Sequence, residues 1–384
     1  MELILFICYT CCIQETKNAK TTMEIIMKKL LMPSIAMCLL AQPFVASADS
    51  KLYGEFRYSL NSVDDNVSDG LTATDNTSLL GIKGWYGDEI KAFYHLQMGA
   101  KTDSNSITDT TIDGTTSKTI NPNDTTLDGT TSTDVSSANI ALGQRFFFAG
   151  LKGGFGKIAY GRMTNAYKFA GFANDPLYNT AGIGANGNFG GGGATYGLSG
   201  ATNGFTDNSL QYSSPKIAGM LTLNAGVYID DSNADEHGTN IGAKINMSGF
   251  LAGIQFASNG TTVVTLPGIV ANGDATRIYL GYKAKAFKAF LSVENVDTSA
   301  TQDTQYVHLT GTYNFTKWNT LTVSLGTVDN GSAKGSGINV GYFHKVAPKT
   351  KVFGTLGSVS LKNQTKDATS LSLGVSHKFS VGGS

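Results

Sequence analysis

The segment SLSLGVSHKF, residues 370–379, places Leu371, Leu373 and Val375 at alternate positions, with serine and glycine between them. Residues 220–229, MLTLNAGVYI, keep the same two-residue period. This period is typical of a β-strand with one apolar and one polar face. From residue 49 onward no window shows a sustained apolar repeat at helical spacing, so the pattern predicts an all-β fold.

Turn-forming residues separate about sixteen such segments, most of them near the length that a tilted membrane strand requires. The predicted strands lie near residues 51–60, 77–86, 88–99, 138–151, 154–163, 206–213, 219–229, 237–247, 250–258, 274–284, 285–296, 304–315, 317–329, 334–346, 348–362 and 367–379. A soluble β-sandwich is the alternative, because its strands alternate in the same way. This many strands exceeds a usual sandwich, so we favour a transmembrane antiparallel β-barrel.

The predicted connections alternate in length, as they do in an outer-membrane barrel with short periplasmic turns and long outer loops. Short turns at Gly87, 152–153, 248–249 and Thr316 follow even-numbered strands, and long polar segments at 61–76, 100–137, 164–205 and 259–273 follow odd-numbered strands. Trp85 and Trp318 fall next to short turns, where we expect a periplasmic aromatic girdle. Closure is also required, because an open sheet in lipid leaves unpaired backbone groups at its edges.

The start of the chain carries an export signal. Residues 27–48, MKKLLMPSIAMCLLAQPFVASA, combine two lysines, a short apolar stretch and a small-residue ending, as in a secretory signal peptide cut after Ala48. The apolar part is shorter than the roughly 20 residues of a membrane-spanning helix. We expect residues 1–26 to be a misassigned upstream extension, with a genuine N-terminal helix as the alternative, and residues 49–384 to form the barrel.

Cysteine content and charge exclude several classes of function. All four cysteines lie at or before Cys38, ahead of the predicted cleavage, so no disulfide, thiol nucleophile or thiol metal site is expected afterwards. Loss of residues 1–48 leaves 25 basic and 26 acidic side chains of the original 29 of each. A net charge this close to zero argues against a nucleic-acid binder, which needs a basic field.

Six segments carry a family resemblance. They are KLYGEFRYSL (51–60), SLLGIKG (78–84), IKAFYHLQ (90–97), RFFFAGLKGGFGKIAYGR (145–162), NSLQYSSP (208–215) and GVSHKF (374–379). In this order they resemble the trimeric general-diffusion porins of Gram-negative bacteria, and the 145–162 block is the most specific. The resemblance implies a sixteen-stranded barrel, a homotrimer, a second loop at about 100–137, and a third loop at about 163–206 folded into the lumen as the constriction.

The resemblance also assigns residues to the constriction. Arg145 matches an arginine cluster that faces the third loop in relatives, and Asp175 is the only acid of that loop before Asp207. Arginine is common in the family where this chain has Leu79, Gln211 and Ser376, and a basic residue is usual where it has Glu55. Arg57 lies two residues on, on the same face, and is expected to compensate. Phe379 corresponds to the aromatic residue used as an assembly signal.

Alternation directs an excess of basic side chains into the lumen. The inward set is Glu55, Arg57, Lys83, Lys91, Arg145, Lys244, Arg277, Lys283, Lys288, Glu294 and Lys378. Of these we expect Glu55, Arg57, Lys83, Lys91, Arg145, Arg277 and Lys288, together with Asp175, to line the pore and its constriction. One sign of charge in a pore concentrates opposite ions, which predicts a mild anion preference. The alternative is that lysines near strand ends lie in screened water at the rim.

Other motifs have simpler interpretations. DTTIDGTTS (109–117) recurs as DTTLDGTTS (124–132), a low-complexity surface loop whose spacing misses the calcium-loop pattern. GNFGGGG (187–193) lacks the Lys-Ser/Thr ending of a phosphate loop. The five histidines show no paired metal spacing, and solvent-facing or interface positions are the default for all of them. We therefore expect no metal, no cofactor and no enzymatic activity.

The sequence as a whole predicts an outer-membrane porin for passive diffusion of small hydrophilic solutes and ions. Its expected partners are outer-membrane lipid, lipopolysaccharide and two further copies of the chain, and nucleic acid is not expected. A substrate-specific channel would need a tandem aromatic track or a dense arginine ladder, and alternation shows neither. A surface adhesin or structural barrel with an occluded lumen is the other alternative.

Overall fold

The computed structural model describes residues 50–64, 69–101, 108–110, 117–119, 141–180, 196–202, 205–230, 236–262, 264–299, 302–331, 334–362 and 366–382. The predicted extension 1–26, the predicted signal peptide 27–48, the glycine-rich segment 187–193 and most of the predicted second loop lie outside the described residues.

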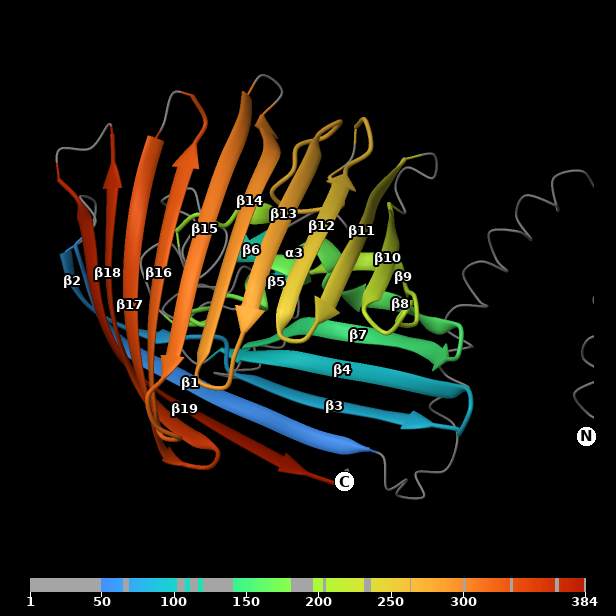
Figure 1. The fold of residues 1–384 in the computed structure, drawn as a ribbon, viewed down its shortest axis with the longest axis horizontal. Helices are drawn as coiled ribbons and strands as arrows, with labels where there is room; N and C mark the ends of the chain where they lie inside the picture. The colour runs from blue at the N-terminus through green and yellow to red at the C-terminus, as the bar shows by residue number, and fades with distance from the viewer. Residues whose placement is uncertain are drawn as a thin grey trace, which may run out of the picture. The chain divides into compact units, whose positions relative to one another are not determined.

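Antiparallel strands dominate the described chain (Figure 1). They are β1 (Lys51–Asp64), β2 (Asp69–Asp75), β3 (Leu79–Tyr86), β4 (Lys91–Lys101), β7 (Ala141–Gly153), β8 (Gly156–Met163), β9 (Thr206–Ser213), β10 (Leu221–Ile229), β11 (His237–Met247), β12 (Phe250–Ser258), β13 (Asp274–Lys283), β14 (Phe287–Ser299), β15 (Gln302–Asn314), β16 (Asn319–Asp329), β17 (Lys334–Ala347), β18 (Thr350–Leu361) and β19 (Ala368–Val381). A separate ribbon pairs β5 (Thr108–Thr110) with β6 (Ser117–Thr119). The helical elements are α3 (Ala166–Phe172) and the 3₁₀ turn η1 (Gly200–Thr202).

The sheet closes on itself. β1 pairs with β19 in a continuous antiparallel register from Leu52 opposite Val381 to Asp64 opposite Thr369. On its other side β1 pairs with β2 and then β3, which together form one wall strand. The result is a closed antiparallel barrel of 16 wall strands, which confirms the predicted fold class. Closure leaves no unpaired edge, as a barrel in lipid requires.

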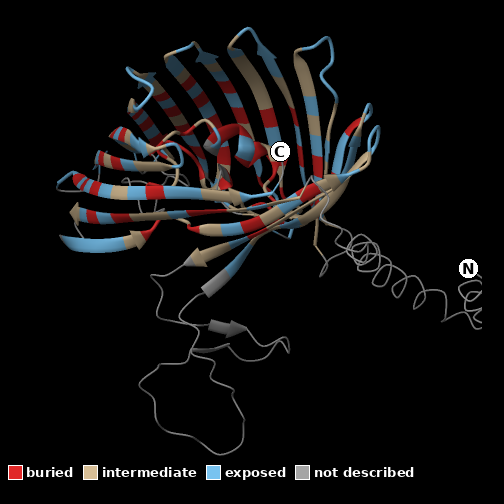
Figure 2. Cartoon of the chain, turned by 90° about the horizontal axis from the view of Figure 1, so that it is seen from below, coloured by how far each residue is buried: buried red, intermediate tan, exposed pale blue. Residues whose placement is uncertain are grey.

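Buried and exposed residues alternate along the wall strands (Figure 2). On β19, Leu371 and Leu373 are exposed on the outside, whereas Ser370 and Ser372 are buried on the inside. The outer face is therefore apolar and the inner face polar, which is the arrangement of a barrel that spans a membrane. None of the described helices has the length and apolar character needed to cross a bilayer.

Two sequence predictions about connections and girdles are wrong. Residues 61–64 and 69–75, predicted as loop, continue β1 and β2, because inward polar groups pair across the strands: the Asn61 amide donates to the Thr74 hydroxyl at 2.9 Å. Polar side chains thus extend the wall instead of ending it. Trp85 belongs to the inward-facing set of β3, opposite Phe93 of β4, and does not join an outer girdle.

Candidate pore constriction and lumen wall

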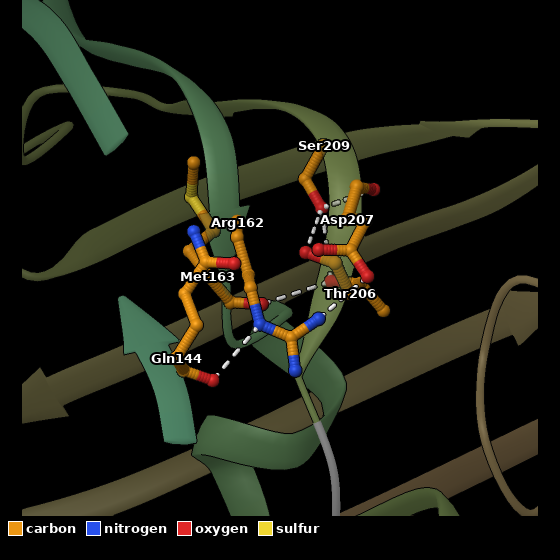
Figure 3. A network of polar contacts seen from close by, with 6 residues as sticks. All are labelled: Gln144, Arg162, Met163, Thr206, Asp207 and Ser209. Atoms are coloured by element: carbon orange, nitrogen blue, oxygen red, sulfur yellow. Dashed lines mark hydrogen bonds and ion pairs between the residues drawn. The ribbon is translucent and has the colours of Figure 1, made fainter. Parts of the chain in front are cut away.

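The segment between β8 and β9, residues 164–205, is here called the inner loop, and the structure describes residues 164–180, 196–202 and 205 of it. The junction is held by side chains from both strands (Figure 3). The Thr206 hydroxyl donates to the Met163 carbonyl at 3.0 Å, and Arg162 forms a 2.5 Å ion pair with Asp207. A β-bulge at Gly161, whose φ is 130°, turns the chain at this point.

The inner loop begins with the short helix α3 inside the barrel (Figure 2). Asn165 caps this helix by accepting a 2.6 Å hydrogen bond from the Lys168 backbone N–H. Tyr167 is buried, and α3 contacts β10, β11 and β12. The loop therefore packs against the inner wall.

A buried ion pair fixes both described arms of the inner loop. Arg277 of β13 and Glu294 of β14 lie opposite each other, with 2.6 Å between Nη2 and Oε1 and both side chains 0% exposed. Arg277 Nη1 donates to the Tyr167 carbonyl at 3.0 Å. The Tyr167 and Ser199 hydroxyls donate to Glu294 Oε2 at 3.1 and 2.6 Å.

This geometry corrects the predicted role of Arg277. Its side chain points inward, as alternation predicted, but it is fully covered and its charge is neutralised by Glu294. Sequence alternation identifies the face of a residue without revealing what packs on that face. Arg277 is an anchor of the inner loop.

The inner loop crosses to the opposite wall at residues 196–197. An added Cβ at Gly326 would lie 1.7 Å from the Tyr196 carbonyl oxygen, and one at Gly337 would lie 2.8 Å from the Tyr196 Cβ. These glycines on β16 and β17 therefore make the space that Tyr196 occupies. Nearby, Leu177 packs against Gly341 in the same manner. Part of the lumen on the β16–β17 side is thus filled by apolar loop side chains.

Glu55 and Arg57 of β1 form the first charged group on the inner wall. Arg57 Nη2 lies 2.5 Å from Glu55 Oε1, and Lys378 Nζ lies 3.7 Å from Glu55 Oε2. The Ser376 hydroxyl also donates to Glu55 at 2.6 Å. The acid is therefore surrounded by two cations, which leaves the group with a net positive charge.

A second cationic group lies where β7 and β8 meet the inner loop, with Arg145, Arg162 and Lys168 around the Phe205 ring. Arg145 of β7 donates to the Gln97 side chain at 2.9 Å, and its guanidinium lies 4.8 Å from the Phe205 ring. Burial, with a smaller contribution from the charges of Arg145 and Arg162, lowers the pKa of Lys168 to about 7. Sequence analysis missed Lys168, because nothing in a loop sequence shows where its helix will pack.

Asp175 and Tyr178 also lie on the inner loop. Asp175 is buried, and its Oδ1 accepts a 2.9 Å hydrogen bond from the Leu177 backbone N–H. Burial raises the pKa of Tyr178, while the charge of Arg145 acts in the opposite direction. Asp175 was predicted to line the pore, but the structure places it among loop groups instead of on an exposed surface.

The remaining predicted residues lie elsewhere on the wall. Lys83, Lys91 and Lys288 are inward-facing residues near the short-turn end, where Lys83 is directly opposite Lys51 and Lys288 opposite Lys283. Phe379 belongs to the outward set and stacks on Phe56 with 5.7 Å between ring centroids.

Aromatic side chains cover part of the inner wall, contrary to the expectation that alternation shows no aromatic track. Phe93 and His95 of β4 lie beside Phe146 and Phe148 of β7, and Phe146 contacts Phe205 of the inner loop. The triplet Phe146-Phe147-Phe148 was the available signal, since two of any three consecutive strand residues share a face. His308 also departs from the default for histidines, because it is buried and bonds to Ser324 at 2.9 Å.

Metal ligation finds no support among the residues that the structure describes. No group of three or more histidine, cysteine, aspartate and glutamate side chains there is arranged to hold a metal ion.

The sequence of this chain is similar to a known protein family and to a known outer membrane protein. A family model described as Gram-negative porin matches residues 34–364. The major outer membrane protein P.IB of Neisseria gonorrhoeae is 29% identical over 242 residues, which are 59% of this chain and 56% of that protein. The aligned region thus spans about half the length of that relative.

Two solved structures share the fold. An anion-selective porin from Comamonas acidovorans has a TM-score of 0.60 at 16% identity, with 86% of this chain and 99% of that chain covered. The trimer form of OmpT, an outer membrane protein of Vibrio cholerae, has a TM-score of 0.57 at 13% identity, with 86% and 99% covered.

Proposed function

This chain belongs to the Gram-negative porin family of the outer membrane, and on that premise we propose that it forms a water-filled channel for passive diffusion of small hydrophilic solutes and ions. The proposed channel is non-enzymatic and prefers anions mildly. Arg57, Arg145 and the inner loop together form its constriction.

The charge balance of the inner wall supports the proposed anion preference. Among the described strand residues, the inward-facing acids are Glu55 and Glu294, and each is held in an ion pair with an arginine. Inward lysines such as Lys83 and Lys157 remain exposed. A pore wall with an excess of one sign of charge raises the local concentration of opposite ions.

The test is a planar-bilayer recording of the refolded protein under a salt gradient. Large, steady conductance steps with a reversal potential toward the chloride equilibrium potential are the expected result. Silence from a folded, heat-modifiable barrel would refute the channel and favour the occluded or adhesive alternative. A cation-selective reversal potential would refute the anion preference alone.

We also propose a homotrimer, with outer-membrane lipid and lipopolysaccharide as its surroundings and Phe379 as the assembly signal. Its support is the trimer form of the Vibrio cholerae structural relative and the apolar outer face. Conductance steps in groups of three, and a trimer mass in native mass spectrometry, are expected. A monomer mass for the conducting species would contradict it.

A further inference from the structure

The rings on the inner wall form one continuous surface. We call Trp85, Phe93, His95, Phe146, Phe148 and Phe205 the aromatic track. Ring centroids lie 6.3 Å apart for Phe93–Phe148, 5.8 Å for Phe146–Phe148 and 5.1 Å for Phe146–Phe205. Trp85 extends the track toward the short turns, because it is directly opposite Phe93 in the β3–β4 register.

Cations accompany the track along its length. Lys91 and Lys152 have their ammonium groups 6.0 and 5.2 Å from the Trp85 ring. Lys157 lies 4.8 Å from Phe93 and 5.7 Å from Phe148. At the inner-loop end, Arg145 and Lys168 lie 4.8 and 4.5 Å from Phe205. Three of these rings, Trp85, Phe93 and Phe148, therefore have an exposed lysine close to the ring.

The track remains accessible, in contrast to the wall across the barrel. The six rings are each only partly buried, whereas inward residues such as Ser292, Thr322 and Asn339 on β14, β16 and β17 are buried. Inorganic anions gain nothing from the faces of aromatic rings, which are negatively polarised. Partly exposed rings on a polar channel wall therefore suggest a ligand that packs against them.

Aromatic faces and cations together define the chemistry of that ligand. A flat aromatic ring can stack on, or meet edge-on, the rings of the track. A single negative charge on the same molecule can pair with Lys157 or Lys152, both of which are exposed. A molecule of the same size without an aromatic ring can make only the charge contact, and one without a charge can make only the ring contact.

We propose that the aromatic track is a binding surface for small aromatic monocarboxylates on their way through the barrel. This proposal rests on the proposed channel function and adds to it a preferred class of solute. The solute enters at one end of the track and exchanges between successive rings while its carboxylate passes from one cation to the next.

Trp85 provides a direct readout, because the chain has only two tryptophans and the other, Trp318, lies in the 315–318 turn. A Trp318→Phe variant reports from the track alone. It is titrated with 3-phenylpropionate and with two matched molecules, 3-cyclohexylpropionate, which has no aromatic ring, and 3-phenylpropionamide, which has no charge. We expect a saturable fluorescence change with 3-phenylpropionate, and binding weaker by about fivefold with each matched molecule.

A pair of variants tests the position of the site. Phe146→Leu with Phe148→Leu keeps apolar bulk on the track and is expected to weaken 3-phenylpropionate binding several-fold. Phe343→Leu, on the inward face of β17 away from the track, is the matched control and is expected to leave binding unchanged. Heat-modifiability on gels shows which variants fold, and the ligand series on the Trp318→Phe protein remains decisive if the double variant does not.

Chloride conductance of the same preparations separates this proposal from the channel itself. Chloride steps combined with equal binding of the three molecules, or with no binding, would overturn the aromatic track and leave the channel standing. Selective binding without chloride steps would support the track as a binding surface and refute the channel.

Discussion

Replacing Glu294 by glutamine tests whether the buried ion pair holds the inner loop in place. Glutamine keeps the shape of the side chain but removes the charge that lies 2.6 Å from Arg277. Removing one partner of a fully buried pair typically costs about 3–5 kcal/mol, because the other charge stays buried without compensation. The loop is joined to the wall here by the Tyr167 and Ser199 hydroxyls and by the Arg277 contact to the Tyr167 carbonyl. We therefore expect the loss to appear as release of the loop.

Two measurements read out this release. Single-channel recordings should show larger open-channel noise and closure at lower voltage, and thermal unfolding of the folded barrel should shift to lower temperature. Asp64→Asn is the matched control, since it breaks an ion pair of the same 2.6 Å length, to Lys366, on an exposed surface. Exposed pairs contribute little, so this variant should behave like the wild type.

A double variant provides a second test of the buried ion pair. Replacing Arg277 and Glu294 together by methionine removes both buried charges, and such exchanges are often neutral or stabilising. The pair of substitutions should therefore be less harmful than Glu294→Gln alone. If Glu294→Gln matches the Asp64→Asn control in noise and stability, the anchor is not what positions the loop.

Three further predictions concern charge and packing at the constriction. Because the pKa of Lys168 is lowered to about 7, its charge is present below that pH and lost above it. Anion preference, measured as the reversal potential, should therefore fall as pH rises through 7. A Lys168→Met channel that shows the same pH dependence would contradict this prediction. Glu55→Gln leaves Arg57 without its acidic partner at 2.5 Å, so anion preference should increase. The increase should be larger at 0.1 M than at 1 M salt, because the Debye length falls from about 10 to about 3 Å. Selectivity that does not change with salt would argue against a role for Glu55 in the lumen. Gly171→Ala would place a Cβ 2.0 Å from Arg277 Nη1, so it should raise the open-channel noise as Glu294→Gln does. Open-channel noise equal to that of the wild type would show that α3 can shift without releasing the inner loop.

Strand positions follow from the sequence because the period of two is a local property. β9, β11 and β12 begin and end at the predicted residues, 206–213, 237–247 and 250–258. In β9 and β11 lipid-facing apolar residues alternate with inward polar or glycine residues, and in β12 the inward positions are Leu251, Gly253, Gln255 and Ala257. Where polar residues continue the strand, as in β1 and β2, the same rule places the end too early.

The lumen was harder to predict, because its contents depend on contacts between distant segments. Arg277 was correctly assigned an inward direction, but the loop that covers it lies about 110 residues earlier in the chain. Arg145 and Phe146 are adjacent yet both serve the inner wall, because a bulge opposite Gln97 and Met98 inserts one residue. Alternation counted along the sequence cannot detect such a shift.

The seam between β1 and β19 also determines when this protein can fold. Its backbone pairs join residues more than 300 positions apart, Asp64 with Thr369 being one of them. Contacts of such long sequence separation slow folding, because a large loop must close before they form. Until the last strand has arrived, the first has one unpaired edge that lipid will not tolerate. Insertion and closure must therefore be late, coupled steps, and the exported chain needs protection from aggregation until the ring is complete.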